Sequence, residues 1–234
     1  MREKRTVVCR RGIFGGTFNP PHWGHLAIAQ AALQQGQLQQ VIWVPSHQPP
    51  HRADEDLLAF EYRWQMVQRA IAPHAAFMAS DLERHRSGRS FAIDTLTHLQ
   101  HDYPDSQWFW VVGLDTFQSL PRWYQSQQVV PQCTWLVAPR PSQAEAPDLQ
   151  PSALEGAIAV AETFRSLGIT LEWVLLDLPP IPISSSLIRS RMQQSRRTAQ
   201  TTWDATPARS PIYTLVPPSL EDYILQHDFY RAHS

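Results

Sequence analysis

Two histidines that follow a pair of glycines form the part of this sequence best suited to chemistry. His22 and His25 are three residues apart, a spacing that places both side chains on the same side of a helical turn. Gly15 and Gly16 precede them and would let a ligand approach the backbone closely. Imidazoles at the start of a helix can donate hydrogen bonds to phosphate oxygens, and the unpaired amides and dipole of the helix also attract anions. The stretch therefore predicts an anion site suited to phosphoryl chemistry.

Other interpretations of these residues stay open on spacing alone. The glycine pair can be a tight turn, and the two histidines can be surface residues. A zinc site is less favoured, because the pair lacks the Glu of a His-Glu-x-x-His helix and no nearby cysteine completes a ligand set. A Walker loop is excluded, because no Gly-Lys-Ser or Gly-Lys-Thr follows the glycines.

A second candidate anion site lies near the other end of the chain. Three serines at 184–186 precede an apolar pair and Arg189. The simplest interpretation is a capped helix start. The functional interpretation is a second helix N-terminus that faces the first one. Its serine hydroxyls and backbone amides would then bind a polyphosphate, and Arg189 would reach the β or γ oxygens.

The segments around these two stretches predict the elements that position them. An apolar run from Val7 to Phe14 predicts a buried strand that Gly15-Gly16 stops, and Pro20-Pro21 predicts the start of a helix that continues to Leu33. Further apolar runs predict strands at residues 41–45, 77–78, 108–112, 133–138 and 171–176. Strands that alternate with helices predict an α/β fold: a Rossmann-like, doubly wound parallel sheet with helices on both faces. Ligands of such sheets bind at the carboxyl ends of the strands, where the glycines lie.

The rest of the chain predicts helices, loops and one insertion. Helical periodicity covers residues 57–71, and the candidates for its inward face are Leu58, Tyr62, Met66 and Ile71. Further helices are expected from Ser90 onward, at 152–167 and at 219–226, with polar or proline-rich loops at 81–90 and 139–149. Residues 193–206 are polar and lack apolar periodicity, so they predict a flexible insertion within a single domain of residues 1–234.

Composition limits the classes of protein to which the chain can belong. It has 234 residues and a formal net charge of −1 without a basic tail, which disfavours nucleic acid as an obligate partner. Cys9 and Cys133 fall inside predicted strands and lack the spacing of a disulfide framework, so buried free thiols are expected. No apolar run reaches the ~18 residues of a membrane helix, and the N-terminus lacks a signal-peptide pattern. A soluble, cytoplasmic protein without a membrane partner is therefore expected.

Several motifs together resemble one enzyme family. Residues 15–25, Gly-Gly-Thr-Phe-Asn-Pro-Pro-His-Trp-Gly-His, are similar to the signature of nucleotidylyltransferases with a His-x-Gly-His motif, and more narrowly of bacterial nicotinate-nucleotide adenylyltransferases. Residues 183–189 resemble that family's Ile-Ser-Ser-Thr-x-Ile-Arg motif, with Ser186 in place of the threonine. Gly113-Leu114-Asp115 and Trp123-Tyr124 match its Gly-x-Asp and Trp-Tyr positions. The resemblance runs from residue 7 to 231 apart from the connector near 140–150 and the insertion, and it implies a C-terminal helix docked on the sheet.

The resemblance implies transfer of the adenylyl group of ATP to nicotinate mononucleotide, which gives deamido-NAD and pyrophosphate for NAD biosynthesis. Mg²⁺ is expected to be held mainly by the ATP phosphates and not by a protein metal site. The implied catalytic residues are His22, His25 and Arg189. Those implied for ATP binding are Gly15, Gly16, Thr17, Phe18, Gly24, Gly113, Asp115, Ile183, Ser184 and Ser185. Those implied for binding of the mononucleotide are Asn19, Arg52, Ala92, Trp123 and Tyr124.

Two of the implied substrate positions depart from the family pattern. Arg52 replaces the lysine of Pro-Pro-His-Lys, which keeps the charge but presents a planar fork. Ala92 replaces the threonine of Ser-Tyr-Thr, whose backbone N–H helps to hold the pyridine carboxylate in the family. A backbone donor survives a change of side chain. The resemblance further implies that Trp123 stacks on the pyridine ring and that the Tyr124 backbone N–H meets the carboxylate.

Alternative functions stay open at the level of the sequence. An adenylyltransferase that prefers nicotinamide mononucleotide would differ by one group on the substrate. A non-catalytic nucleotide-binding regulator would keep the fold, although the retention of His22, His25 and Arg189 together speaks against it. An RNA-binding fragment related to class I aminoacyl-tRNA synthetases is disfavoured by the charge balance and the lack of an anticodon-binding region. A homo-oligomer is left open.

Overall fold

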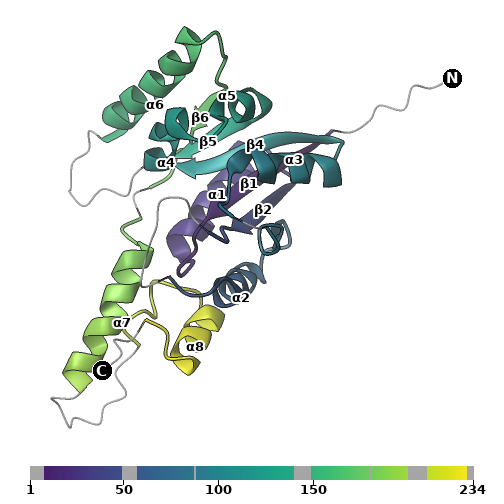
Figure 1. The fold of residues 1–234 in the computed structure, drawn as a ribbon. Coiled ribbons are helices and arrows are strands. Elements are labelled where there is room, and N and C mark those ends of the chain that lie inside the picture. Colours follow the sequence, from purple (N-terminus) through teal and green to yellow (C-terminus); the bar gives the residue numbers. More distant parts are fainter. Residues whose placement is uncertain are drawn as a thin grey trace.

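The centre of the molecule is a parallel sheet of six strands (Figure 1). The computed structural model describes residues 8–48, 57–86, 88–139, 149–179, 181–199 and 210–230. The strands are β1 (Cys9–Gly16), β2 (Gln40–Pro45), β3 (Phe77–Ala79), β4 (Ser106–Gly113), β5 (Thr134–Ala138) and β6 (Trp173–Leu175). Their order across the sheet is β3-β2-β1-β4-β5-β6, and every pairing is parallel. This order confirms the predicted Rossmann-like, doubly wound architecture: strands are added to one side of β1 up to β3 and to its other side from β4 on, so the strand order reverses between β1 and β4.

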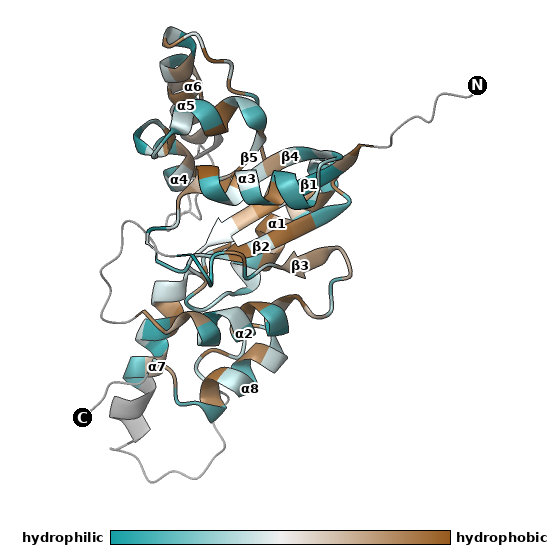
Figure 2. Ribbon diagram, turned by 45° about the vertical axis from the view of Figure 1, so that its right-hand side comes forward, coloured by the Kyte–Doolittle hydropathy of each residue, from teal (hydrophilic) through white to brown (hydrophobic). Residues whose placement is uncertain are grey.

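Helices cover both faces of this sheet, as predicted. The longer ones are α1 (Trp23–Gln35), α2 (Phe60–Ile71), α3 (Ala92–Asp102), α6 (Leu149–Ser166), α7 (Ser185–Ala199) and α8 (Pro218–Gln226). The short ones are α4 (Leu114–Gln118), α5 (Ser126–Val129) and two 3₁₀ turns at Leu120–Arg122 and Val130–Gln132. One apolar cluster joins the sheet to α1, α2, α7 and α8, and a second joins its other face to α3, α4 and α6. In Figure 2, hydrophobic residues follow the central strands while hydrophilic ones alternate along the surrounding helices.

Alternation along the strands explains the two clusters. Phe14 belongs to the first cluster and its neighbour Ile13 to the second, and Val111 and Trp110 divide in the same way. Successive side chains of a strand point to opposite faces, so a central parallel strand with helices on both sides is apolar at every position. This is why the central strands could be located as continuous apolar runs.

Helix α8, near the C-terminus, packs on α2. Figure 1 shows α8 beside α2, and places α2, α7 and α8 at the opposite end of the molecule from α4, α5 and α6. The Arg69 guanidinium of α2 lies 4.0 Å from the centre of the Tyr223 ring of α8. The Ser219 hydroxyl also donates to the Arg69 carbonyl at 3.3 Å. The helix implied to dock on the sheet is therefore joined to it largely through α2.

Several local predictions differ from the structure. Residues 193–199 continue α7 as helix and are not a loop, because Ser184 caps that helix and its glutamines, arginines and methionine favour helical backbone. Residues 200–206 of the predicted insertion lie outside the described residues. Tyr62 is exposed instead of inward-facing, since it lies at the edge of α2 against Phe229, with ring centroids 4.8 Å apart. The helix predicted from Pro20 begins at Trp23, with the prolines in the loop before it.

Other predictions hold with small shifts or stay untested. The third strand, the 171–176 strand and the 152–167 helix appear with slightly different ends. Cys9 lies in β1 and Cys133 just before β5, and both are free thiols, but only Cys133 is buried as expected, whereas Cys9 is partly exposed. Among the described residues, no helix has both the length and the apolar character that a membrane crossing requires. The single domain of residues 1–234 and the cytoplasmic location stay predictions.

Candidate active site

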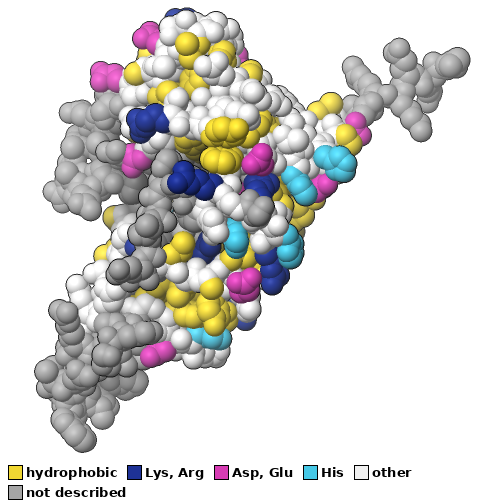
Figure 3. Space-filling view, in the orientation of Figure 1, with side chains coloured by type: hydrophobic (Ala, Val, Ile, Leu, Met, Phe, Trp, Pro, Cys, Tyr) yellow, Lys and Arg dark blue, Asp and Glu magenta, His cyan; other side chains and the backbone are white. Residues whose placement is uncertain are grey.

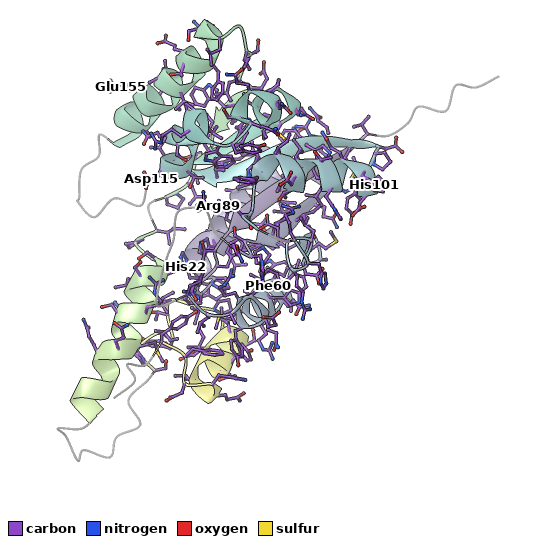
Figure 4. The ribbon with its side chains drawn as sticks, in the orientation of Figure 1. His22, Phe60, Arg89, His101, Asp115 and Glu155 are labelled. Atoms are coloured by element: carbon purple, nitrogen blue, oxygen red, sulfur yellow. The ribbon has the colours of Figure 1, made fainter. Side chains whose placement is uncertain are left out.

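The candidate site lies where the two central strands end. β1 ends at Gly16 and β4 at Gly113, and these strands are hydrogen-bonded neighbours. Ligands of doubly wound sheets bind at this position, because the loops after the two strands diverge and leave a crevice. In Figure 4, His22 and Asp115 lie at this end of the sheet and His101 lies at the other. Figure 3 has the same orientation as Figure 4, and basic and histidine side chains gather across the middle of the surface that it shows.

Gly15 and Gly16 are the last two residues of β1, so the strand continues through the pair that was expected to stop it, and the two glycines have different tasks. A Cβ placed on Gly15 would have no other atom within 4 Å, so this backbone is open to a ligand. A Cβ on Gly16 would come within 2.9 Å of the Phe18 ring, which is itself buried. Phe18 has a φ of 49°, a left-handed conformation that turns the chain sharply. Gly16 is thus needed for packing, whereas Gly15 leaves free space.

His22 and His25 form a close pair at the start of α1. Their ring centroids are 3.8 Å apart, and His22 is the N-cap residue of the helix. A Cβ on Gly24 would lie 3.0 Å from the His22 ring and 3.6 Å from the Ile183 carbonyl oxygen. The glycine of the His-x-Gly-His pattern therefore lets the ring lie against the helix and lets the 183–189 segment approach it.

Both histidines are neutral in the free protein at pH 7. Burial, followed by the proximity of His25, lowers the pKa of His22 from 6.5 to about 2. Burial lowers the pKa of His25 to about 4. The Nδ1 atoms of both rings are buried without a hydrogen-bond partner among the described residues. A neutral imidazole can still donate one hydrogen bond, so the pair can serve a phosphate oxygen without carrying a charge.

The two predicted motifs meet at the loop after β1. The Ser185 hydroxyl donates to the Pro20 carbonyl at 2.8 Å, and Arg189 Nη1 donates to the Asn19 carbonyl at 3.0 Å. Ser184 has the capping role, because its hydroxyl accepts the Leu187 N–H at 3.1 Å. The N-terminus of α7 is thereby fixed beside that of α1, as the functional interpretation required.

Asn19 faces the protein and not the open side of the loop. It is buried, and its Oδ1 accepts hydrogen bonds from the Tyr230 hydroxyl at 2.9 Å and the Leu58 N–H at 3.4 Å. Burial raises the pKa of the Tyr230 hydroxyl, so it remains protonated and able to donate. The predicted substrate contact of Asn19 stays a prediction, and its observed bonds hold the loop in shape.

The residues predicted for the pyridine ring also come together. Ala92 is the first residue of α3, and the ring of the preceding Phe91 lies 4.5 Å from that of Tyr124. Trp123 is half-buried: it packs edge-on against Trp110 with centroids 6.1 Å apart, and its Nε1 donates to Ser119 at 2.9 Å. The segments that contain Ala92 and Tyr124 are thus joined by a contact between the Phe91 and Tyr124 rings.

Two further predicted residues lie at the end of β4, and one lies outside the described residues. Gly113 is the N-cap of α4, and a Cβ there would have no other atom within 4 Å. Asp115 is exposed in the first turn of α4. Both placements suit a nucleotide that lies across the end of β4. Arg52 belongs to the residues that the structure does not describe.

Known proteins resemble this chain over nearly its whole length. Residues 13–191 match the cytidylyltransferase-like family. Proteins from Trichormus variabilis and a Nostoc species, each described as a probable nicotinate-nucleotide adenylyltransferase, are 43% identical to it over 222 residues. Those alignments cover 95% of this chain and 97% of each relative. The chain belongs to the nicotinate-nucleotide adenylyltransferase family.

Solved structures show the same fold as this family member. The nicotinic acid mononucleotide adenylyltransferase of Plasmodium falciparum, complexed with APC, superposes with a TM-score of 0.66 at 17% identity. The same enzyme complexed with NaAD gives a TM-score of 0.66 at 18% identity. Both comparisons cover 95% of this chain and 97% of the other.

Sequence reasoning missed three residues that shape the site in this family member. Arg63 donates to the Thr17 carbonyl at 2.8 Å, Tyr230 binds Asn19 and Glu83 binds the backbone of His47 at 3.2 Å. Each lies far from the motifs in the sequence, and each acts on backbone or on a buried amide. An arginine inside a helical pattern and a glutamate in a charged loop read as surface residues, so only their burial reveals them.

Proposed function

We propose that this chain transfers the adenylyl group of ATP to nicotinate mononucleotide, forming deamido-NAD and pyrophosphate. The observation that supports it best is the junction of the two motifs. His22 and His25 at the start of α1 and Arg189 on α7 are brought to the loop after β1, which follows the open Gly15 near the end of that strand. This arrangement could bind a polyphosphate, because it brings together two helix N-termini, two imidazoles and a guanidinium, all of which can donate hydrogen bonds to phosphate oxygens.

The reaction is an in-line displacement at the α-phosphorus of ATP. An oxygen of the mononucleotide 5′-phosphate forms a bond to that phosphorus, and the bond from it to the bridging oxygen of the β-phosphate breaks. The electron pair of the broken bond leaves with pyrophosphate. A phosphate monoester with a second pKa of about 6 is already largely dianionic at neutral pH, so the step needs no strong general base.

The residues of the site align the two substrates and stabilise the charge. His22 and His25 donate hydrogen bonds to phosphate oxygens during transfer, and Arg189 holds the departing pyrophosphate. The Thr17-Phe18 backbone borders the α-phosphate. The segment at Gly113 and Asp115 receives the adenosine part, which accords with the open backbone at Gly113.

Mg²⁺ enters this proposal with ATP. The described residues contain no group of three or more His, Cys, Asp or Glu side chains arranged to hold a metal ion. In the proposal the ion is carried by the phosphates, where it neutralises part of their charge.

The acceptor is recognised at the other end of the site. In the proposal, the backbone N–H groups of Ala92 and Tyr124 donate hydrogen bonds to the pyridine carboxylate at the start of α3. Trp123 supplies an aromatic surface for the pyridine ring. The contact between Phe91 and Tyr124 supports this part, because it holds the two segments together. A helix N-terminus at Ala92 favours an anionic carboxylate over a neutral amide.

Pyrophosphate release tests the proposal directly. The protein is assayed with ATP and Mg²⁺ and, in parallel, with nicotinate mononucleotide or nicotinamide mononucleotide at equal concentration. Strong preference for the acid is expected. Preference for the amide would change the substrate but keep the chemistry, and inactivity with both would favour a nucleotide-binding regulator.

A further inference from the structure

Arg63 is a buried cation that binds three separate backbone segments. Its side chain is 1% exposed, and burial lowers its pKa to about 10, which still leaves it charged at neutral pH. Nε donates to the Leu58 carbonyl at 2.9 Å, Nη1 to the Thr17 carbonyl at 2.8 Å and Nη2 to the His47 carbonyl at 3.4 Å. One guanidinium thus joins the loop after β1, the loop after β2 and the start of α2.

Glu83 is a buried anion that completes this arrangement from the opposite side. It is 5% exposed, and its Oε2 accepts the His47 N–H at 3.2 Å. Its Oε1 accepts the Thr95 hydroxyl of α3 at 2.8 Å, and the Arg86 guanidinium lies 3.9 Å from the same oxygen. The backbone of His47 is therefore bound by a cation at its carbonyl and by a carboxylate at its amide.

These contacts constrain both halves of the proposed site. A trans peptide is planar, with its C=O and N–H pointing in opposite directions. Because Arg63 holds the Thr17 carbonyl, the Phe18 N–H of the same peptide is directed away from Arg63. Through His47 and Glu83 the same network reaches Thr95, one turn inside α3, the helix whose first residue is Ala92.

We propose that Arg63 and Glu83 are positioning residues that set the geometry of the ATP and mononucleotide subsites together. This inference rests on the proposed function, which assigns one subsite to ATP and the other to the mononucleotide. Arg63 aims the Phe18 amide at the α-phosphate, and Glu83 fixes α3 and the His47 loop for the acceptor. A buried charged group adds little net stability compared with an apolar residue of the same volume, so the use of these two side chains, which both bind the His47 backbone, is to specify geometry.

The Arg63→Lys variant tests the first half. Lysine keeps the charge but lacks the planar fork that reaches three carbonyls. A fall in kcat of about 10- to 100-fold is expected, because an oriented amide donor is lost from the transition state. Arg69→Lys is the matched control: Arg69 lies on the same helix, but it packs on Tyr223 of α8 and not on the site. It should change the melting temperature without changing kcat or either KM.

The Glu83→Gln variant tests the second half. Glutamine has the same shape but no charge: if its oxygen accepts the His47 N–H, its amide group must donate to the Thr95 hydroxyl, which reverses that hydrogen bond and places an N–H group beside Arg86. The KM for the mononucleotide should rise about tenfold while the KM for ATP stays within about twofold. Glu61→Gln is the control, since Glu61 is exposed and pairs only loosely with Arg84 at 3.5 Å.

Three readouts separate positioning from a merely structural role. The double variant R63K/E83Q should lose less kcat/KM than the product of the two single losses, because both residues bind the backbone of the same residue, His47. Calorimetric binding of a non-hydrolysable ATP analogue should weaken about tenfold in R63K and not in R69K, even if the wild-type protein proves inactive with every mononucleotide. That inactivity would refute the proposed function alone. The positioning role would be refuted if R63K and E83Q kept the wild-type kcat, KM values and analogue affinity and differed from the wild type only in a lower melting temperature.

Discussion

The two ends of the proposed site are built in different ways. At the phosphate end, His22 is 6% exposed, and side chains from α2 and α7 bind the carbonyls of Thr17, Asn19 and Pro20. At the pyridine end, Tyr124 is 55% exposed and its segment is held by ring contacts. In the proposed function, the chemical step therefore takes place on a preorganised backbone, whereas the acceptor is recognised by more exposed residues. Changes at the first end should therefore lower kcat, and changes at the second should raise the KM for the mononucleotide.

The largest effect is expected at His25. His25→Ala removes a donor to phosphate in the transition state and should lower turnover roughly 10²- to 10³-fold. Steady-state pyrophosphate release measures it, and circular dichroism checks the fold. The control is His98→Ala, which changes an exposed histidine of α3 and should leave turnover unchanged. A fully active, folded His25→Ala protein would remove His25 from the catalytic group.

Arg189 should give a loss of similar size at the same end. Arg189→Ala removes both the bond to the Asn19 carbonyl and the charge proposed to hold pyrophosphate, so turnover should fall roughly 10²-fold or more. Arg191→Ala, two residues further along α7, removes only a 3.5 Å contact to the Pro211 carbonyl and should have little effect. Equal rates for these two variants would contradict the role of Arg189.

The glycine pair should separate ligand binding from folding. Gly15→Ala meets no atom within 4 Å, so the protein should keep its melting temperature while its affinity for ATP falls about tenfold or more by steric exclusion. Gly16→Ala places a Cβ 2.9 Å from the Phe18 ring and should lower the melting temperature instead. Calorimetry of unfolding and of ATP-analogue binding measures both. Unchanged ATP affinity in Gly15→Ala would place the nucleotide elsewhere.

At the open end, Trp123→Ala should act mainly on KM. Loss of an aromatic surface is worth about 0.5–1.5 kcal/mol, which corresponds to a rise of up to roughly tenfold in the KM for the mononucleotide with the KM for ATP unchanged. Because Trp123 also packs on Trp110, the fold of the variant is checked first. A loss in kcat alone would mean that the tryptophan does not contact the acceptor.

The smallest effect expected is on acid stability. Burial lowers the pKa of His25 from 6.5 to about 4, so between these values the unfolded chain binds a proton that the folded chain excludes. The free energy of unfolding should therefore fall as pH drops from 6.5 toward 4. His25→Gln should reduce that slope, as urea titrations at several pH values would show. An unchanged slope would mean that the histidine is not neutral in the fold.

The difference between the two ends also explains what sequence could predict. Central strands such as β1 and β4 are apolar at every position, and His22, His25 and the 183–189 segment carry recognisable spacing, so fold and motif contacts were predictable. The contacts of Arg63, Glu83 and Tyr230 were not predictable, because their partners include backbone groups and a buried amide. Every residue has backbone groups, so the sequence does not indicate which of them these side chains bind. The helical character of 193–199 was missed because that part of α7 lacks an apolar stripe and follows from its cap and residue propensities.

The hydrogen bonds to the loop after β1 determine whether residues 13–25 could keep their conformation in another protein. Its carbonyls are held by side chains 46, 165 and 170 positions away in the sequence, and Asn19 is held by a hydroxyl 211 positions away. Transplanting residues 13–25 into another parallel sheet would carry the glycines and histidines but none of these anchors. The smallest transferable module that retains the shape of this loop is therefore nearly the whole chain, and descent of this site by exchange of short segments is disfavoured.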